Sequence, residues 1–312
     1  MTEGANQTVE QLKGKKIVVT GVTGQIAFPM AEYLAQHNEV YGVARFTAEG
    51  SRERVEKAGI QPVVSDLGDA DYSGIPTDAD YLAHLAAYMV PQSLDYDEAI
   101  RQNAEATGLL LQHCRNYAAA LVMSTQSVYK PVDDPFHVFK TTDPLGDVNA
   151  FTPPYSISKI SQEAVARTMA RILDLPVTIA RMNASYGSNG GLPTQHLQAI
   201  AEGRPVTTRW DPCTYQPIHQ DDINTQLAGL LAAATVPATI VNWAGDEQVS
   251  VQEWAAYMGE LLGKTPTVNV VVTPGTLRGS YADVSSRAAA TGPCNVSWRD
   301  GIRRVAEELY PA

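Results

Sequence analysis

The chain has 312 residues, 44% hydrophobic and 18% charged, a composition typical of a soluble globular protein with a large core. Its formal net charge of −11 argues against partners such as nucleic acid or an anionic membrane surface. The three cysteines and six histidines are scattered and show no metal-ligand spacing, so we expect no metal site and no disulfide framework. A reducing compartment, the cytoplasm, fits this cysteine usage best.

The first structural signal follows a polar N-terminal segment. Residues 1–13 lack the basic and apolar regions of a signal peptide, so we expect a flexible tail there. Residues 16–20 form a β-branched run that predicts a buried strand. Gly21-x-x-Gly24-x-x-Ala27 comes next and leads into a helical pattern. A strand, a glycine turn and a helix form the context of a dinucleotide-binding fingerprint, which predicts a pyrophosphate site at the helix N-terminus.

The second predicted strand, residues 39–44, ends where the adenosine ribose of such a cofactor is expected. An acidic residue there would favour NAD, but this chain has Arg45. A guanidinium group pairs well with a 2′-phosphate, so the sequence predicts a preference for NADP(H), with NAD(H) as the alternative cofactor. A third strand, residues 61–65, leads to Asp66, which is either an acceptor for the adenine amino group or a turn former.

Two further strands are predicted to end beside the cofactor. The fourth ends in Ala86 and Ala87, which are small enough to permit close approach of a flat ligand. The fifth, residues 119–123, is followed by Ser124 and Thr125. Because ligands bind at the carboxyl ends of strands in an open parallel sheet, we expect a hydroxyl group here to hydrogen-bond a substrate oxygen.

A helix predicted over residues 154–173 carries Tyr155 and Lys159, four residues apart and therefore on one face. An ammonium group one turn from a phenol is expected to stabilise the phenolate and lower the pKa of Tyr155. The pair can then move a proton beside a carbonyl or alcohol carbon. An isolated pair at this spacing usually marks a packed ring and a solvated amine, so the rest of the chain has to support the catalytic interpretation.

Strands alternate with helices as far as a sixth strand at residues 177–181. This order predicts an α/β fold of the Rossmann type, a doubly wound parallel sheet with helices on both faces. Longer loops rich in Gly and Pro then predict a smaller C-terminal substrate lobe. We expect a dinucleotide-binding domain at residues 14–187, completed by residues 218–246, and a substrate-binding lobe at residues 188–217 and 247–312.

Taken in order, these motifs resemble those of the extended short-chain dehydrogenases/reductases of the NAD-dependent epimerase/dehydratase family. The resemblance extends over about residues 15–310. It rests on Thr20-Gly21-x-x-Gly24-x-x-Ala27, Asp66-Leu67, His84-Leu85-Ala86-Ala87, Asn103, Ser124-Thr125, Tyr155-x-x-x-Lys159, Tyr186-Gly187 and Ile218-His219-x-Asp221-Asp222.

The resemblance implies catalytic roles for Tyr155 as acid/base, for Lys159, which would also hold the nicotinamide ribose, and for Thr125, with Ser124 just before it. It implies that the cofactor contacts Gly21, Gly24, Gln25, Ile26, Asp66, Leu67, Ala86, Ala87 and Asn103. It also implies a homodimer formed through two helices, here residues 95–117 and 154–173.

Two departures from the family pattern concern the substrate. Nucleotide-sugar 4,6-dehydratases carry an acidic pair after the catalytic threonine, where this chain has Gln126 and Ser127, so water elimination by that route is not expected. Nucleotide-sugar epimerases have an arginine shortly before the His-x-Asp-Asp segment to grip the diphosphate. This chain has Tyr215 and Gln216 in that neighbourhood, and Arg209 or Arg278 is available as a substitute.

A third departure is Arg45 itself, because an NADP(H) preference suits net reduction better than an internal redox cycle. The sequence therefore predicts an NAD(P)-dependent reductase or dehydrogenase acting on a small carbonyl compound or secondary alcohol, with Tyr155 moving the proton. The alternative is a nucleotide-sugar epimerase that keeps NAD tightly bound. A third possibility, a non-catalytic dinucleotide sensor, has no need of Tyr155, Lys159 and Thr125.

Overall fold

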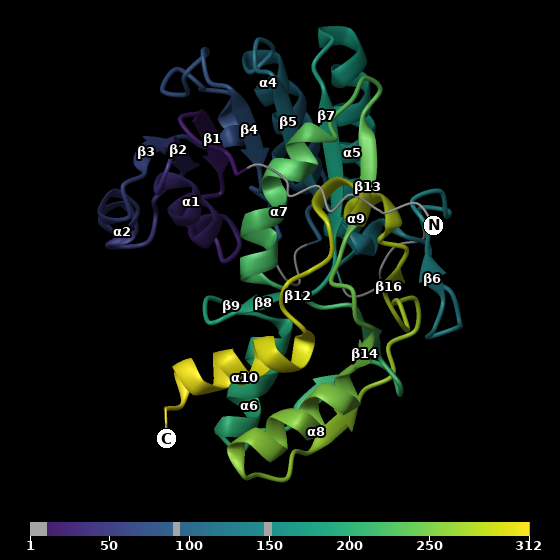
Figure 1. Ribbon diagram of the computed structural model, residues 1–312. Helices are drawn as coiled ribbons and strands as arrows, with labels where there is room; N and C mark the ends of the chain where they lie inside the picture. The colour runs from purple at the N-terminus through teal and green to yellow at the C-terminus, as the bar shows by residue number, and fades with distance from the viewer. Residues whose placement is uncertain (1–10, 90–93, 147–151, 312) are drawn as a thin grey trace, which may run out of the picture.

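The computed structural model describes residues 11–89, 94–146 and 152–311, so most of the predicted N-terminal tail lies outside the described residues. Seven parallel strands of this part of the chain form the main sheet, in the order β13-β7-β5-β4-β1-β2-β3 (Figure 1). Their bounds are β1 Lys16–Thr20, β2 Glu39–Ala44, β3 Gln61–Val64, β4 Tyr81–His84, β5 Ala119–Thr125, β7 Val177–Met182 and β13 Thr239–Trp243. The strand order reverses between β1 and β4, which places a ligand-binding crevice at the carboxyl ends of these strands.

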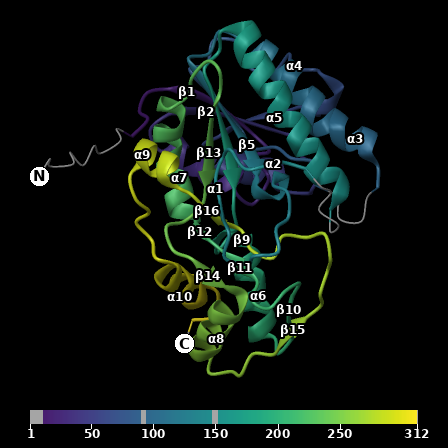
Figure 2. The same ribbon diagram turned by 90° about the vertical axis from the view of Figure 1, so that its right-hand side faces the viewer.

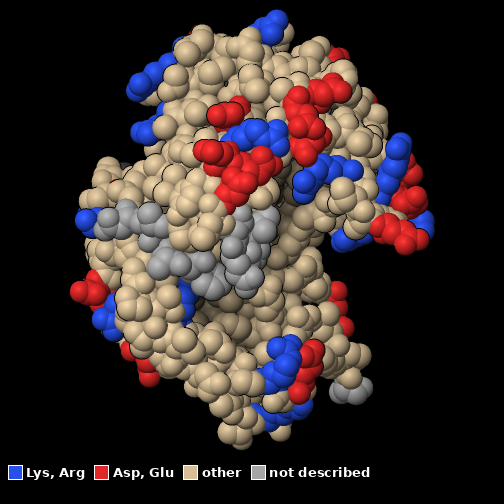
Figure 3. All heavy atoms as spheres, turned by 180° about the vertical axis from the view of Figure 1, so that it is seen from behind, with Lys and Arg blue, Asp and Glu red and all other residues tan. Residues whose placement is uncertain are grey.

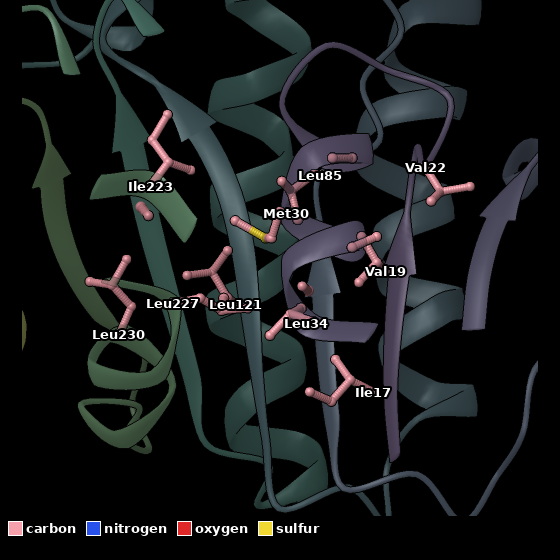
Figure 4. Close-up of a cluster of buried hydrophobic side chains, with 14 of the residues drawn as sticks. Ile17, Val19, Val22, Met30, Leu34, Leu85, Leu121, Ile223, Leu227 and Leu230 are labelled. Atoms are coloured by element: carbon pink, nitrogen blue, oxygen red, sulfur yellow. The ribbon is translucent and has the colours of Figure 1, made fainter. Parts of the chain in front are cut away.

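Helices cover both faces of the sheet, as the alternating sequence pattern predicts. Helices α1 (Ala27–Ala35) and α7 (Gln220–Ala232) pack on one face. Figure 4 shows the core beneath them, where Met30, Leu34 and Leu227 point toward strand residues such as Leu121. The opposite face is covered by α3 (Tyr96–Ile100), α4 (Ala106–His113) and the long helix α5 (Pro153–Leu173), which lie side by side (Figure 2). Helix α2 (Ser51–Lys57) follows β2, and α9 (Ser285–Thr291) packs beside α7.

A second lobe lies at the end of the sheet where the strands finish (Figures 1 and 2). Helices α6 (Leu192–Ala201), α8 (Val251–Leu262) and α10 (Trp298–Leu309) pack there around Trp254, Met258 and Ile302. The lobe and its junction with the main sheet also contain short strands: β8 Ser185–Gly187, β9 Gly190–Gly191 and β12 Ile218–His219 in one sheet, and the pairs β10 Val206–Thr208 with β15 Val268–Val270, β11 Thr214–Tyr215 with β14 Val249–Ser250, and β6 Val138–Phe139 with β16 Tyr281–Ala282.

Three elements differ from the sequence-based expectations, each for a local reason. The helix predicted over residues 95–117 is interrupted by a π-helical turn at Arg101–Glu105, where the Asn103 side chain bonds the backbone of Tyr88 instead of facing solvent. The fourth strand ends at His84, because the Thr20 hydroxyl accepts hydrogen bonds from the next two backbone N–H groups. Strand β5 continues to Thr125, because its last two residues pair with β7.

The described part of the chain has mixed charges on the surface shown and no long apolar helix. Figure 3 shows Lys and Arg side chains interspersed with Asp and Glu side chains on one face, without a continuous basic field. No helix in the described part of the chain is long and apolar enough to cross a membrane. The described residues also contain no cluster of three or more His, Cys, Asp or Glu side chains able to hold a metal ion.

Candidate active site

A cavity of about 570 Å³ lies at the carboxyl ends of the central strands. This volume is in the usual range for a pocket that binds a cofactor or small molecule. The predicted site residues that line it are Gly21, Gly24, Gln25, Ile26, Arg45, Asp66, Leu67, Ala86, Ala87, Ser124, Thr125 and Tyr155. Residues scattered over more than a hundred positions of the sequence therefore meet in one place.

The glycine turn after β1 leaves open space beside the start of α1. Gly21 has a φ of 72°, and a Cβ atom there would lie 2.8 Å from Cα of Ala86, so only glycine fits. A Cβ atom on Gly24 would meet one protein atom within 4 Å, the Gly21 carbonyl oxygen at 3.0 Å. Ile26 is the N-cap residue of α1, makes no side-chain capping hydrogen bond, and lines the cavity. Backbone N–H groups at this helix start therefore suit a pyrophosphate.

One arginine and one aspartate, Arg45 and Asp66, also line this cavity. The Arg45 side chain is 60% exposed, and its Nη1 lies 3.8 Å from Oδ2 of Asp66. The other carboxylate oxygen of Asp66 accepts hydrogen bonds from Gly68 N at 3.0 Å and from Gln102 Nε2 at 3.2 Å. Asp66 thus stabilises a turn, one of the two roles considered for it, and it also lines the cavity. An adenosine group here would meet charges of both signs.

The predicted reaction end of the cavity contains Tyr155 and Thr125. Burial raises the pKa of Tyr155 to about 12, and a hydrogen bond with Thr125 acts in the opposite direction. Lys159 Nζ lies 6.0 Å from the centre of the Tyr155 ring and donates a hydrogen bond to Met123 O at 2.7 Å. Burial lowers the pKa of Lys159 to about 7, while Glu163 raises it. Burial is therefore the largest influence on the pKa of each group, and the lowering of the Tyr155 pKa by a protonated Lys159 stays a prediction.

The two neighbouring hydroxyl groups of β5 have different surroundings. Ser124 is 2% exposed and its Oγ donates to Oε1 of Glu163 at 2.6 Å, so this hydroxyl is engaged with the protein. Thr125 Oγ1 lies 2.9 Å from Ser127 Oγ. Thr125 lines both this cavity and the adjoining one described below. Of the two hydroxyl groups, that of Thr125 is the one placed to contact a substrate oxygen.

Behind this end of the cavity lies a buried ion pair that sequence reasoning missed. Arg181 on β7 contacts both carboxylate oxygens of Glu163, with Nε to Oε1 at 2.9 Å and Nη2 to Oε2 at 2.7 Å. Its Nη1 also donates to Tyr129 OH and to Thr141 O, each at 3.0 Å. The available sequence signal was the spacing of Glu163, which follows Lys159 by one helical turn and therefore shares its face.

Two predicted site residues do not line the cavity. Lys159 lies behind it, bonded to β5 as described. Asn103 is 1% exposed, accepts from Tyr88 N at 2.7 Å, and donates to Tyr88 O and to Ser158 Oγ, each at 2.9 Å. It therefore ties the segment after β4 to helix α5. Cavity-lining residues that the sequence did not suggest include Thr23, Ser65, Tyr88, Met89, Gln102, Met182, Asn183 and Ser185.

A second cavity of about 240 Å³ adjoins the first and shares Thr125, Met182 and Asn183 with it. Arg209 is the one Lys, Arg, Asp or Glu side chain among the described residues that line this second cavity. Its Nη2 donates to Tyr215 OH at 3.5 Å. The remaining lining residues are Gln126, Ser127, Ala184, Leu192, Cys213, Thr214, Leu277, Gly279 and Ser280.

The structure distinguishes the two arginines that the sequence offered as substitutes at the substrate site. Arg278 does not line either cavity. Its guanidinium group lies 4.7 Å from the centre of the Trp210 ring, and its Nη1 donates to Asp133 O at 3.0 Å. Of these two arginines, Arg209 is therefore the one that lines the second cavity.

Comparison with known sequences identifies the family of the chain. The model of the NAD dependent epimerase/dehydratase family matches residues 17–214. Among curated proteins, dTDP-glucose 4,6-dehydratase 1 of Escherichia coli (strain K12) is 30% identical over 204 residues, which cover 55% of each chain. The chain thus spans about half the length of the curated relatives it matches.

Comparison with solved structures supports the fold over nearly the whole chain. The UDP-glucuronic acid 4-epimerase from Bacillus cereus, solved with UDP-glucuronic acid and NAD, has a TM-score of 0.81 at 22% identity and covers 95% of this chain and 100% of its own. The UDP-N-acetylglucosamine 4-epimerase from Methanobrevibacter ruminantium M1, in complex with UDP-N-acetylmuramic acid, has a TM-score of 0.81 at 20% identity, with coverages of 96% and 99%.

Proposed function

Because the chain belongs to the NAD dependent epimerase/dehydratase family, we propose that it is a nucleotide-sugar epimerase that uses a dinucleotide cofactor retained through the reaction. The reductase of a small carbonyl compound, which the sequence favoured first, has less support than this alternative. Both the curated dehydratase and the solved epimerases are named for nucleotide sugars. The non-catalytic sensor has less support still, since Tyr155 and Thr125 meet in a cavity large enough for a cofactor.

The observation that carries the proposal is the junction of the two cavities at Thr125. The first cavity has the size and the glycine-lined helix start that suit a dinucleotide. The second begins at the same threonine and offers a single charged side chain, the cation of Arg209. In a chain with a net charge of −11, a ligand that carries phosphate needs such a local cation. A small neutral ketone needs no such group.

We infer that the cofactor is NAD(H). The sequence-based preference for NADP(H) rested on Arg45, but Arg45 faces the carboxylate of Asp66 across 3.8 Å. A 2′-phosphate placed beside Arg45 would be attracted by the guanidinium group and repelled by that carboxylate. The phosphate therefore adds little to the free energy of cofactor binding. The Bacillus cereus neighbour is solved with NAD. Residues Gly21, Gly24 and Ile26 would hold the pyrophosphate through backbone N–H groups.

A nicotinamide cofactor held in the first cavity would supply an acceptor and donor of hydride for one sugar carbon. Tyr155 accepts the proton of the sugar hydroxyl group as that carbon is oxidised, and donates it back when the carbonyl is reduced. Thr125 holds the reacting oxygen by a hydrogen bond. Lys159 is held behind β5 by Met123 O and, when protonated, supplies a positive charge that favours the phenolate of Tyr155. The configuration inverts if the keto sugar turns its other face before reduction.

The side chains beside Thr125 argue against a dehydratase reaction. Water elimination requires a general acid that protonates the departing hydroxyl group. Gln126 and Ser127 occupy the two positions after Thr125, and neither an amide nor an alcohol donates a proton readily at neutral pH. We therefore propose that products keep all the hydroxyl groups of the substrate.

The assembly state and the location of the protein are two further proposals. We propose a homodimer through helices α4 and α5, where Leu109 is 49% exposed and Ile172 is 70% exposed. We also propose a cytoplasmic location, from the cysteine usage alone. Light scattering of the purified chain tests the dimer, and a monomer mass at micromolar concentration would contradict it.

The proposal is tested by incubating the protein with UDP-glucose, UDP-glucuronic acid, UDP-N-acetylglucosamine and dTDP-glucose, followed by chromatographic separation of the products. We expect one of these sugars to be converted to an epimer, with no keto-deoxy product. The Tyr155→Phe variant, which keeps the ring and loses the hydroxyl group, is the control. Steady consumption of added NADPH with a simple ketone, and no turnover of any sugar, would instead support the reductase.

A further inference from the structure

The turn of the short hairpin formed by β8 and β9 contacts the glycine turn that follows β1. Asn189 lies between the two strands of this hairpin, and its Nδ2 donates a hydrogen bond to Gln25 O at 2.6 Å. The hairpin lies between the main sheet and the second lobe (Figure 1). Thr194 on α6 donates from Oγ1 to Gly187 O at 2.8 Å and ties the hairpin to that lobe. Asn189 therefore joins the second lobe to the turn that is expected to bind the pyrophosphate.

A second amide side chain, that of Gln220 at the start of α7, completes this contact. Gln220 is 5% exposed, and its Nε2 donates to Ile26 O at 3.2 Å. Its Oε1 accepts from Asn189 Nδ2 at 3.1 Å. A backbone carbonyl group can only accept, so the nitrogen of each amide must face the turn and both orientations are determined. The two amides thus form one hydrogen-bonded pair that holds the carbonyl groups of Gln25 and Ile26.

Two glycines of the hairpin leave room for the Gln25 side chain. A Cβ atom on Gly190 would lie 3.4 Å from the Gln25 side chain, and one on Gly191 would lie 2.9 Å from its Nε2. Gln25 Nε2 also donates to Ser185 Oγ at 3.5 Å, and both of these residues line the first cavity. The turn and the hairpin are therefore adjoining parts of the wall of that cavity.

The two carbonyl groups belong to peptide units whose N–H groups lie at the start of α1. The Gln25 carbonyl shares its unit with the Ile26 N–H group, and the Ile26 carbonyl shares its unit with the Ala27 N–H group. In a trans peptide the C=O and N–H bonds point in opposite directions, so holding each carbonyl also fixes the direction of its N–H group. The first N–H groups of a helix have no partner within that helix, and Ile26 and Ala27 line the cavity. A pyrophosphate would thus meet donors that are oriented before it binds.

We propose that Asn189 and Gln220 are positioning residues for the dinucleotide, which orient the N–H groups of Ile26 and Ala27 and thereby slow release of the cofactor. This role rests on the proposed function, since a cofactor retained through the reaction is part of it. Both side chains act through the turn, because neither belongs to the described residues that line the first cavity. Loss of either amide leaves one carbonyl group of the turn without its side-chain donor, so the turn is free to adopt orientations that bind phosphate less well.

The test replaces each amide and compares it with a matched amide outside the cavity. Asn189→Ala and Gln220→Met each remove one donor to the turn, the second at similar side-chain length. Asn38→Ala is the control, because Asn38 Nδ2 likewise donates to two backbone carbonyl oxygens, Leu12 O and Leu34 O, each at 2.9 Å. Asn38 is half-buried, as Asn189 is, and it is not among the described residues that line the first cavity.

Protein loaded with NADH is mixed with an excess of NAD, and the decay of bound-NADH fluorescence gives the dissociation rate. We expect both variants to release NADH roughly three- to tenfold faster than wild type, the effect of one hydrogen bond, and the control to stay within about twofold. Calorimetry should show the same loss of affinity for NAD and for ADP-ribose, which carries the pyrophosphate without the nicotinamide. Thermal unfolding of the cofactor-free variants, compared with that of the control, confirms that they are folded.

Release rates of both variants within about twofold of wild type would overturn the positioning role. Weaker binding of NAD with unchanged binding of ADP-ribose would overturn it as well. The wild-type rate tests the proposed function separately. If wild type releases NADH rapidly and both variants release it faster still, the positioning role stands and the retained cofactor does not. If wild type retains NADH and the variants retain it equally, the retained cofactor stands and the positioning role fails.

Discussion

The sharpest energetic prediction concerns replacement of Glu163 by glutamine. The Glu163 side chain is 0% exposed and that of Arg181 is 2% exposed, so neither charge has water to screen it. Glu163→Gln keeps the shape and removes the negative charge, which leaves the Arg181 guanidinium group with the neutral partners Tyr129 and Thr141. Removing one member of a buried pair typically costs about 3–5 kcal/mol. That is a large share of the roughly 5–15 kcal/mol by which a domain is stable.

The same substitution is expected to change the pH dependence of activity. Burial lowers the pKa of Lys159 to about 7, and Glu163 is the neighbour that raises it. Without the carboxylate the pKa of Lys159 falls further, so at neutral pH a smaller fraction of the protein carries the ammonium group that favours the Tyr155 phenolate. We expect the pH–rate profile that reports Lys159 to move to lower pH.

Urea denaturation followed by tryptophan fluorescence measures the change in the free energy of unfolding. Glu56→Gln is the matched control, because the Arg52–Glu56 pair is 3.0 Å long but its side chains are 54% and 47% exposed. We expect the control substitution to lower the free energy of unfolding by less than about 1 kcal/mol. Glu163→Gln could instead lower the free energy of unfolding by no more than the control does and leave the pH–rate profile unchanged. The buried pair would then have neither the structural nor the electrostatic role assigned to it.

Three further predictions follow from the site. Tyr155→Phe should reduce turnover by about 10²–10⁴-fold while NAD binding, measured by fluorescence titration, stays within twofold; near wild-type turnover would exclude Tyr155 as the acid/base. Arg45→Ala should weaken NADP(H) binding by roughly three- to tenfold and leave NAD(H) binding unchanged. Calorimetry measures the two dissociation constants, and the same ratio between them in wild type and variant would contradict this. Burial lowers the pKa of His84 from 6.5 to about 3. Stability should therefore fall as the pH is lowered from about 6.5 toward 3, by at most about 5 kcal/mol, and urea titrations of wild type and His84→Gln should differ in this pH-dependent part.

Much of the fold is readable from the sequence because its signals are local. The β-branched runs predict β1 and β2 with the bounds that the structure has. The glycine turn, the hydroxyl pair at the end of β5 and Tyr155 could likewise be placed at one edge of the sheet, because parallel strands all end there.

What the sequence could not provide depends on contacts between distant segments. The partner of Glu163 is Arg181 on another strand, and no spacing in the sequence points to it. The choice between Arg209 and Arg278 needed the path of the loops, which places one in the second cavity and the other over Trp210. The pKa of Tyr155 depended on how deeply the ring is buried, which a helical spacing does not report.

The central claim is that oxidation and reduction occur on one sugar with one retained cofactor. The most direct measurement follows a deuterium label on the sugar carbon that is oxidised, in a nucleotide sugar that the protein converts. We predict that the epimer keeps the label and that the absorbance of reduced nicotinamide shows no net change. The purified protein should also release close to stoichiometric NAD(H) on acid treatment. Accumulation of labelled reduced cofactor in solution, matched by net oxidation of the sugar, would contradict the account.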